Sequence, residues 1–258
     1  MVRVKSGALL SCQQLRSSAI LSLMNVSRGA RERVRAEITR EIRAAARRQL
    51  ARVGAAALSQ RAVARELGLA SSALYRYFPS RDDLLTVLIV DAYDALGAHV
   101  EAADASCQCD RFGERWLAVC RAVRQWALAH PHEYALIFGS PVPGYHAPTK
   151  ITVPPAIRVP KVLCALLRDA ACAGALQPGL PFQPPSGAVA ADAASMQATL
   201  MSGVPTDAVV RLLIAWTHLF GVVSFELFGH LRGTVTDNAA YFDHTAALIG
   251  HFIGLPDD

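Results

Sequence analysis

The stretch LGLASSALYRYFPSRDDL, residues 67 to 84, decides the fold that this sequence predicts. Gly68 can adopt the positive φ of a tight turn, and Pro79 cannot continue the short helix that follows it. Ser80 with Asp83 three residues later is typical of a capped helix start. The stretch therefore predicts a turn, one very short helix and the first turn of a longer one.

Two more helices are predicted upstream of this stretch. The first begins near Arg31, repeats apolar residues on one face and ends at Gly54. Ser59 is placed to cap the second helix. This helix is short, and its inner face carries Val63, Ala64 and Leu67. A small residue where two short helices cross, followed by a glycine four positions on, is the spacing of a helix-turn-helix. Leu74 and Phe78 are then core anchors.

Charge divides the chain unevenly. Residues 1–81 carry 16 Lys and Arg against 4 Glu, a net charge of +12, whereas residues 82–258 have a net charge of −7. This asymmetry indicates a basic segment that meets a polyanion and an acidic body that does not. It argues against a sequence-independent DNA-packaging protein, which would be basic throughout.

Catalytic and metal-binding patterns are absent from the sequence. It contains no GxSxG, HExxH or phosphate-binding glycine loop, so we expect no enzyme, although an all-helical enzyme stays an alternative. The six cysteines are scattered through apolar surroundings and are expected to be reduced, which favours a cytoplasmic protein. Cys107 and Cys109 lack a second pair at zinc spacing, so no metal or cofactor is predicted.

The remainder of the chain has helical apolar periodicity only. Further helices are expected near residues 111–129, 134–138, 157–174, 188–201, 206–231 and 238–253, with irregular proline-rich segments at 141–160 and 178–185. The sole candidate membrane span, Ala208 to Phe225, contains Arg211 and His218. A buried helix explains it better than a bilayer does, so no membrane partner is predicted.

The sequence predicts three regions. Residues 1–27 are expected to be an extension without regular structure, unless translation starts at Met24. Residues 28–79 form the helix-turn-helix domain, and residues 80–258 form a helical body. Because the helix from Thr206 is apolar around its whole circumference, it is expected to pack on its own domain and on a second copy. Candidate dimer contacts are Gly221, Phe225, Phe228, Leu248 and Phe252; an ordinary monomer core is the alternative.

The stretch LSQRAVARELGLASSALYRYFPSRDDLL, residues 58–85, resembles the DNA-binding region of the TetR family of one-component regulators. The resemblance extends from Arg31 to about Leu88. The hexapeptide Trp216-Thr-His-Leu-Phe-Gly221 is similar to the W-x-H-x-x-G signature of one class of TetR C-terminal domains. One departure is Ala70, where the family often has a serine or threonine cap, so Ser71 or Ser72 is a candidate cap instead.

The resemblance implies an all-helical homodimer in which the first three helices bind double-stranded operator DNA. The remaining helices would hold a small-molecule effector and the dimer interface. Repression released by a small apolar effector is the expected outcome, with activation or ligand-independent regulation as alternatives. Tyr75 and Tyr77 match family positions that contact phosphates.

Candidate site residues follow from the pattern and the resemblance together. The start of the recognition helix reaches base edges, and basic or hydroxyl side chains around it suit phosphates. The candidate DNA contacts are Arg31, Arg35, Ser59, Arg61, Ser71, Ser72, Ala73, Tyr75, Arg76, Tyr77 and Arg81. Candidate ligand contacts, for each of which core packing is the competing interpretation, are Trp116, Cys120, Trp126, Phe138, Tyr145 and His218.

Overall fold

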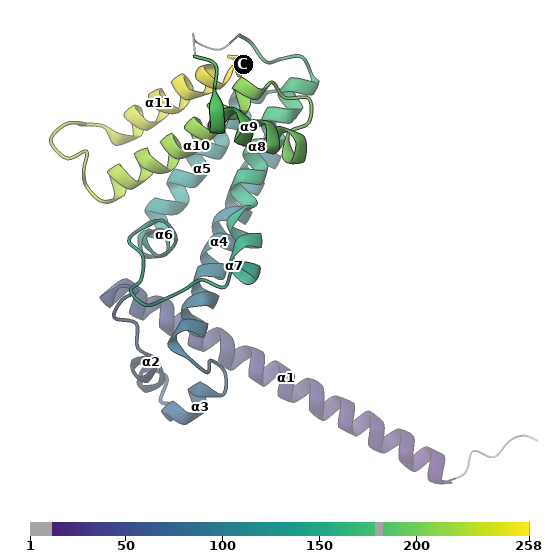
Figure 1. The fold of residues 1–258 in the computed structure, drawn as a ribbon. Helices are drawn as coiled ribbons and strands as arrows, with labels where there is room; N and C mark the ends of the chain where they lie inside the picture. Colours follow the sequence, from purple (N-terminus) through teal and green to yellow (C-terminus); the bar gives the residue numbers. More distant parts are fainter. Residues whose placement is uncertain (1–11, 179–182, 258) are drawn as a thin grey trace, which may run out of the picture.

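The computed structural model describes residues 12–178 and 183–257, with side chains from residue 30 onward. All regular structure in these residues is helical, which confirms the all-α prediction. Figure 1 shows a small head formed by α2, α3 and part of α1, joined to a larger body. The helices are α1 (Cys12–Val53), α2 (Gln60–Glu66), α3 (Ser71–Tyr75), α4 (Arg81–Ala105), α5 (Phe112–Ala129), α6 (Pro131–Phe138), α7 (Thr149–Ala156), α8 (Arg158–Cys172), α9 (Gly187–Leu200), α10 (Thr206–Leu227) and α11 (Asn238–Ile253).

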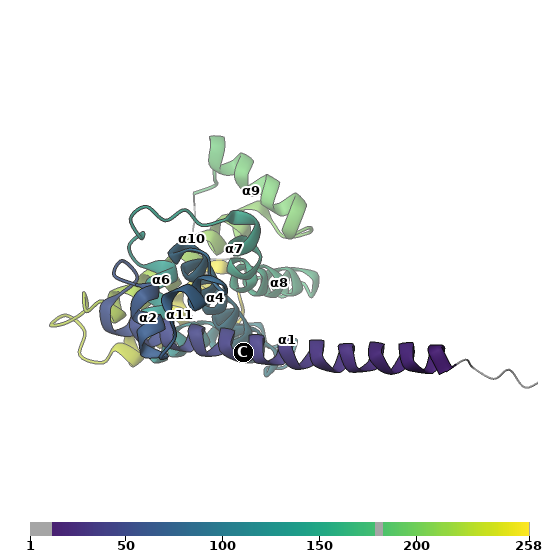
Figure 2. The same cartoon turned by 90° about the horizontal axis from the view of Figure 1, so that it is seen from below.

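The helix α1 starts earlier than the sequence predicted. It runs from Cys12 instead of Arg31, so it includes most of the segment expected to lack regular structure, and residues 1–11 lie outside the described residues. No proline interrupts residues 12–53, and a helix that has nucleated extends while each amide finds a partner. Figure 2 shows α1 projecting far beyond the other helices. Its predicted end is correct, because Gly54 has φ of 73°.

The helix α4 belongs to both the head and the body. Its start is the predicted capping box: the Ser80 hydroxyl accepts from the Asp83 amide at 3.0 Å, and the Asp83 carboxylate accepts from the Ser80 amide at 2.9 Å. The first turns of α4 place Leu84, Leu85 and Leu88 in the head core, whereas later turns enter the body core. A single straight helix therefore fixes the two units relative to each other.

The head has its own hydrophobic core. Its buried members come from α1, α2, α3, the start of α4 and the segments between them, and they are Ile42, Ala45, Ala46, Leu58, Val63, Ala64, Leu74, Phe78, Leu84, Leu85 and Leu88. Leu136, Val142 and Tyr145, from α6 and the loop after it, pack against the edge of this cluster. The body therefore contacts the head through α6 and its loop as well as through α4.

The proline-rich segment 141–160 was predicted to be irregular, and this is wrong for its second half. The helix α7 occupies Thr149–Ala156 with Pro154 and Pro155 inside it. Proline has a φ compatible with a helix, but inside one it removes a hydrogen bond and its ring crowds the carbonyl four residues earlier, so both prolines carry a cost. Burial of Thr152 and Pro155, in a helix that packs on α4, offsets the loss.

The body core surrounds α5 and α10. Trp116 of α5 is 1% exposed and donates its indole N–H to the Ala246 carbonyl of α11 at 2.7 Å. Tyr134 of α6 is fully buried, and its hydroxyl donates to the Phe220 carbonyl at 3.0 Å. Burial raises the pKa of Tyr134 to about 12, so the hydroxyl keeps its proton. Buried polar groups of this kind are stable because each has a partner.

The helix α10 is long and apolar enough to cross a membrane by length and composition. Its mean hydropathy is 1.7 over its most apolar window, and 44% of that window is buried within the protein. It packs against α5, α8, α9 and α11. These contacts agree with the interpretation of α10 as a helix packed within the protein.

Candidate nucleic-acid interface

The turn between α2 and α3 depends on Gly68. Its φ is 64°, a value that residues with a side chain rarely adopt, and an added Cβ would meet nothing within 4 Å. Glycine is therefore required by the backbone conformation and not by lack of space for a side chain. The Leu69 amide donates to the Ala64 carbonyl at 2.9 Å and closes the turn. This geometry confirms the predicted helix-turn-helix connection.

The recognition helix α3 begins without a side-chain cap. Ala70 is the N-cap residue with φ of −64° and ψ of 139°, and the Ala73 amide donates to its carbonyl at 2.9 Å. Ser71 and Ser72 lie inside the first turn, so the expectation that one of them caps the helix is wrong. Both side chains are exposed, which leaves two hydroxyl groups available at the outer end of α3.

Gln60 holds α3 in place, although the sequence analysis missed it. Its side chain is buried, and its amide nitrogen donates to the carbonyls of Phe78 and Ser80, each at 2.8 Å. These two bonds join the first residue of α2 to the segment that follows α3. The helical spacing of Gln60 indicates its burial, because it lies on the same face of α2 as Val63 and Ala64.

Contacts from α1 fix the opposite end of α2 and the loop before it. Ser59 occupies the predicted N-cap position but makes no side-chain cap; its amide donates instead to the buried Gln49 side chain at 3.0 Å. Arg48 and Arg52 bind the Glu66 carboxylate at 2.7 and 2.6 Å. Those hydrogen bonds lower the pKa of Glu66, so the carboxylate stays charged and α2 stays aligned on α1.

The outer face of α3 is polar and open to solvent. Leu74 is fully buried and fixes the helix to the head core, while Tyr75 on the opposite side is 42% exposed. Arg76 is exposed and makes no ion pair within the described part of the chain, and the same is true of Arg61 on α2 and Arg31 on α1. Unpaired cations next to exposed hydroxyl groups are suited to a polyanionic partner.

Arg35 and Tyr77 contact each other. The guanidinium carbon of Arg35 lies 5.1 Å from the centroid of the Tyr77 ring, and one of its nitrogens donates to the Arg76 carbonyl at 3.4 Å. Arg35 therefore joins α1 to the end of the recognition helix instead of extending freely. Tyr77 is half-buried, and its ring is fixed beneath this cation.

Arg81 is occupied by the protein. Its guanidinium donates to three carbonyls of the loop between α1 and α2, namely Leu58 at 3.1 Å and Ala55 and Ala56 at 2.9 Å each. The predicted role of Arg81 as a phosphate anchor therefore competes with a structural role. It connects the loop before α2 to the first turn of α4.

Comparison with known proteins matches both parts of the chain to one family. Residues 42–88 match the model described as bacterial regulatory proteins, tetR family, and residues 116–249 match that of the tetracyclin repressor-like C-terminal domain. The chain belongs to the TetR family of transcriptional regulators. The HTH-type transcriptional regulators Rv1816 of Mycobacterium tuberculosis and Mb1846 of Mycobacterium bovis are each 39% identical over 231 residues, 86% of this chain and 93% of theirs.

Solved structures share the fold. The crystal structure of SCO4313, a protein assigned a regulatory role, is 37% identical with a TM-score of 0.68, and the match covers 84% of this chain and 97% of that one. The TetR family regulator PfmR from Thermus thermophilus is 17% identical with a TM-score of 0.53, covering 84% of this chain and 99% of that one. The relatives and the family are regulators and not enzymes, as predicted. This TetR-family chain is therefore a DNA-binding transcriptional regulator.

The predicted ligand residues of the regulator do not line one cavity. Trp116, Cys120 and His218 meet at a space of about 10 Å³ between α5, α10 and α11, which is the size of one water molecule. Burial raises the pKa of the Cys120 thiol and lowers that of His218, so both are neutral near pH 7. His218 Nε2 is buried without a hydrogen-bond partner among the described residues.

The other three predicted ligand residues are dispersed. Phe138 packs between Tyr134 and Phe220 with ring centroids 5.0 and 4.4 Å away, and Trp126 is 5% exposed in the body core. The Tyr145 hydroxyl lies 2.9 Å from that of Thr86 on α4, at the edge of the head. Core packing, the competing interpretation, describes Phe138 and Trp126.

Proposed function

We propose that this TetR-family regulator is a cytoplasmic homodimer that represses transcription by occupying an operator, and that a small apolar effector releases it. The two recognition helices of a dimer would enter successive major grooves about 34 Å apart. Binding there blocks access to a promoter. The observation that carries the proposal is the set of exposed apolar side chains along α10 and α11, here called the stripe.

That stripe has the composition of a subunit interface. Figure 1 shows α10 and α11 side by side at the edge of the body. Phe225 on α10 is 55% exposed, Phe228 directly after α10 is 46% exposed, and Leu248 on α11 is 49% exposed. Large apolar side chains exposed together on neighbouring helices mark interaction sites. Two such pairs of helices would form a four-helix bundle across a twofold axis.

Two further predicted interface residues fit this surface differently. Gly221 is half-buried, and an added Cβ would meet nothing within 4 Å, so the backbone of α10 is open to close approach by another helix. Phe252 is half-buried, and the Arg211 guanidinium lies 5.4 Å from its ring centroid. Gly221 therefore suits the centre of the proposed interface, and Phe252 its margin.

The proposed DNA contacts divide by the exposure of their side chains. Ser71, Ser72 and Arg76 are exposed on α3 and are assigned to base edges and the adjacent backbone, with Ala73 half-buried beside them. Arg31, Arg61 and Tyr75 are exposed around this face and are assigned to phosphates. Arg35, Tyr77, Ser59 and Arg81 are half-buried or bound to protein groups, so we assign them mainly to positioning α2 and α3.

Light scattering at micromolar concentration tests the dimer. The wild type is expected to have twice the chain mass of 27.6 kDa. Phe225→Asp places a charge in the centre of the stripe and is expected to yield monomers, because an unpaired charge is costly in an apolar interface. Val189→Asp on α9 is the matched control, since Val189 is also 52% exposed, and it should remain dimeric. A monomeric wild type would contradict the proposal.

A further inference from the structure

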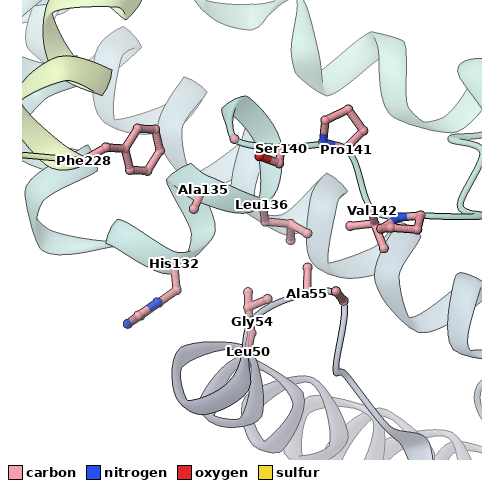
Figure 3. Close-up of a pocket in the computed structure, with 13 residues that line it drawn as sticks. Leu50, Gly54, Ala55, His132, Ala135, Leu136, Ser140, Pro141, Val142 and Phe228 are labelled. Atoms are coloured by element: carbon pink, nitrogen blue, oxygen red, sulfur yellow. The ribbon is translucent and has the colours of Figure 1, made fainter. Parts of the chain in front are cut away.

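An apolar groove lies between the head and the body. Its volume is about 560 Å³, within the range of small-molecule sites. One wall is the end of α1 and the loop after it; the other is α6 and the loop after it. Figure 3 shows His132 and Leu136 of α6 above the ends of Leu50 and Ala55, with Phe228 at one side.

We propose that this groove binds a small, mostly apolar ring-containing molecule with one hydrogen-bonding group. The inference rests on the proposed ligand response and places its effector at the head–body junction instead of inside the body. The aliphatic lining from Leu50, Leu136 and Val142 suits an aromatic or alicyclic skeleton, and Phe228, which we also assign to the subunit interface, lies at its margin. His132 and Ser140 are the side chains that can meet a hydroxyl, carbonyl or carboxylate group.

The lining excludes other classes of ligand. None of its residues is Lys, Arg, Asp or Glu, so a nucleotide or another multiply charged anion would find no counterion. The volume is that of a small molecule, whereas a folded protein partner needs about 800 Å² of surface. The cavities between body helices are smaller, at about 110 Å³ between α5 and the end of α11, about 80 Å³ between α8, α9 and α10, and about 10 Å³ between α5, α10 and α11.

The groove stays open because its walls cannot close easily. Gly54, Ala55 and Ala56 form one wall and carry no side chain beyond Cβ. Pro141 and Pro143 stiffen the opposite rim, because each fixes its own φ. An added Cβ at Gly139 would approach the Ala135 carbonyl oxygen to 2.3 Å, so the turn that ends α6 also depends on glycine.

The same wall is connected directly to the DNA-binding helices. The carbonyls of Ala55 and Ala56 accept the hydrogen bonds of Arg81, which begins α4 next to the end of α3. Gln60 then binds the carbonyls of Phe78 and Ser80 on the other side of that junction. A ligand that displaces the loop at residues 55–56 therefore changes the position of Arg81 and of α3. The loop then has two positions, and the ligand binds one of them more tightly. Occupancy of the groove lowers operator affinity by a factor that cannot exceed the ratio of the ligand's affinities for these two positions.

Fluorescence titration of the full chain with 8-anilinonaphthalene-1-sulfonate, an aromatic probe with one anionic group, tests the site. Ala135→Trp and Ala56→Trp fill the groove from opposite walls, so one variant remains informative if the other fails to fold. Each is expected to weaken probe binding about tenfold or more, because the indole occupies the ligand's volume. Ala98→Trp on the exposed side of α4 and Leu213→Trp in the α8–α10 cleft should bind the probe like the wild type.

Operator binding by fluorescence anisotropy provides the second readout. Saturating probe is expected to weaken operator binding of the wild type about fivefold or more. Ala135→Trp should bind the operator with the same affinity in the presence and absence of probe, since the indole occupies the groove and Ala135 makes no contact assigned to DNA. Unchanged probe binding in both groove variants, or loss only in Leu213→Trp, would overturn the site. Absence of any operator binding would instead refute the proposed function, because probe binding does not require DNA.

Discussion

Replacement of Arg76 by alanine is expected to weaken operator binding by about 10- to 100-fold, the range of one side chain that contacts a base edge. Arg76 is exposed at the end of α3, has no ion-pair partner among the described residues and lies beside Tyr75 and Ser72. Its guanidinium can therefore bind DNA without first breaking an ion pair within the protein. A gel-shift titration of the purified variant against its operator measures the loss.

Arg65→Ala is the matched control for this experiment. Arg65 is also an exposed arginine of the helix-turn-helix without an ion-pair partner in the described structure, but it lies in the last turn of α2. Removing it changes the net charge by the same amount, so an effect of charge alone would be equal in both variants. We expect a loss of about threefold or less for Arg65→Ala, since general electrostatic attraction is spread over many cations. Equal losses would remove α3 as the reading face.

Replacement of Gln60 by leucine is expected to destabilise the head by about 2–4 kcal/mol, because an unsatisfied buried acceptor costs about 1–3 kcal/mol. The change keeps most of the side-chain volume but removes both donors, which leaves the carbonyls of Phe78 and Ser80 without these partners. Urea unfolding followed by circular dichroism measures the free energy of unfolding. Operator affinity should fall as well, because α3 loses its attachment.

Gln125→Leu is the corresponding control on α5. Gln125 is exposed, so the same substitution there removes no buried hydrogen bond and should change stability by about 0.5 kcal/mol or less. A Gln60→Leu variant as stable as this control would show that the two 2.8 Å bonds do not hold the end of α3.

Features determined by neighbouring residues were predictable from the sequence. The turn at Gly68, the end of α1 at Gly54 and the capping box at Ser80 each follow from backbone conformations or bonds within a few residues. Leu74 and Phe78, four residues apart, were assigned to the core, and both are buried there, Leu74 within α3 and Phe78 just after it. The family resemblance rested on the same residues.

Features that join distant segments were not predictable in this way. The bonds of Gln60 and Arg81 connect residues about 20 positions apart in the chain, and no periodic pattern specifies which carbonyl such a side chain reaches. The groove exists only because the α6 loop packs against the end of α1. The predicted ligand residues were chosen by type, and type alone does not separate a core aromatic from one that lines a cavity.

The most direct test of the account is the affinity of the wild type for its own operator relative to random duplex. Footprinting on DNA flanking its gene would locate that operator, and anisotropy titrations at several salt concentrations would yield both affinities. We expect the operator to be preferred by about a thousandfold or more, with both affinities falling as salt rises. Equal affinity for the two duplexes would contradict a sequence-specific regulator that reads DNA with α3.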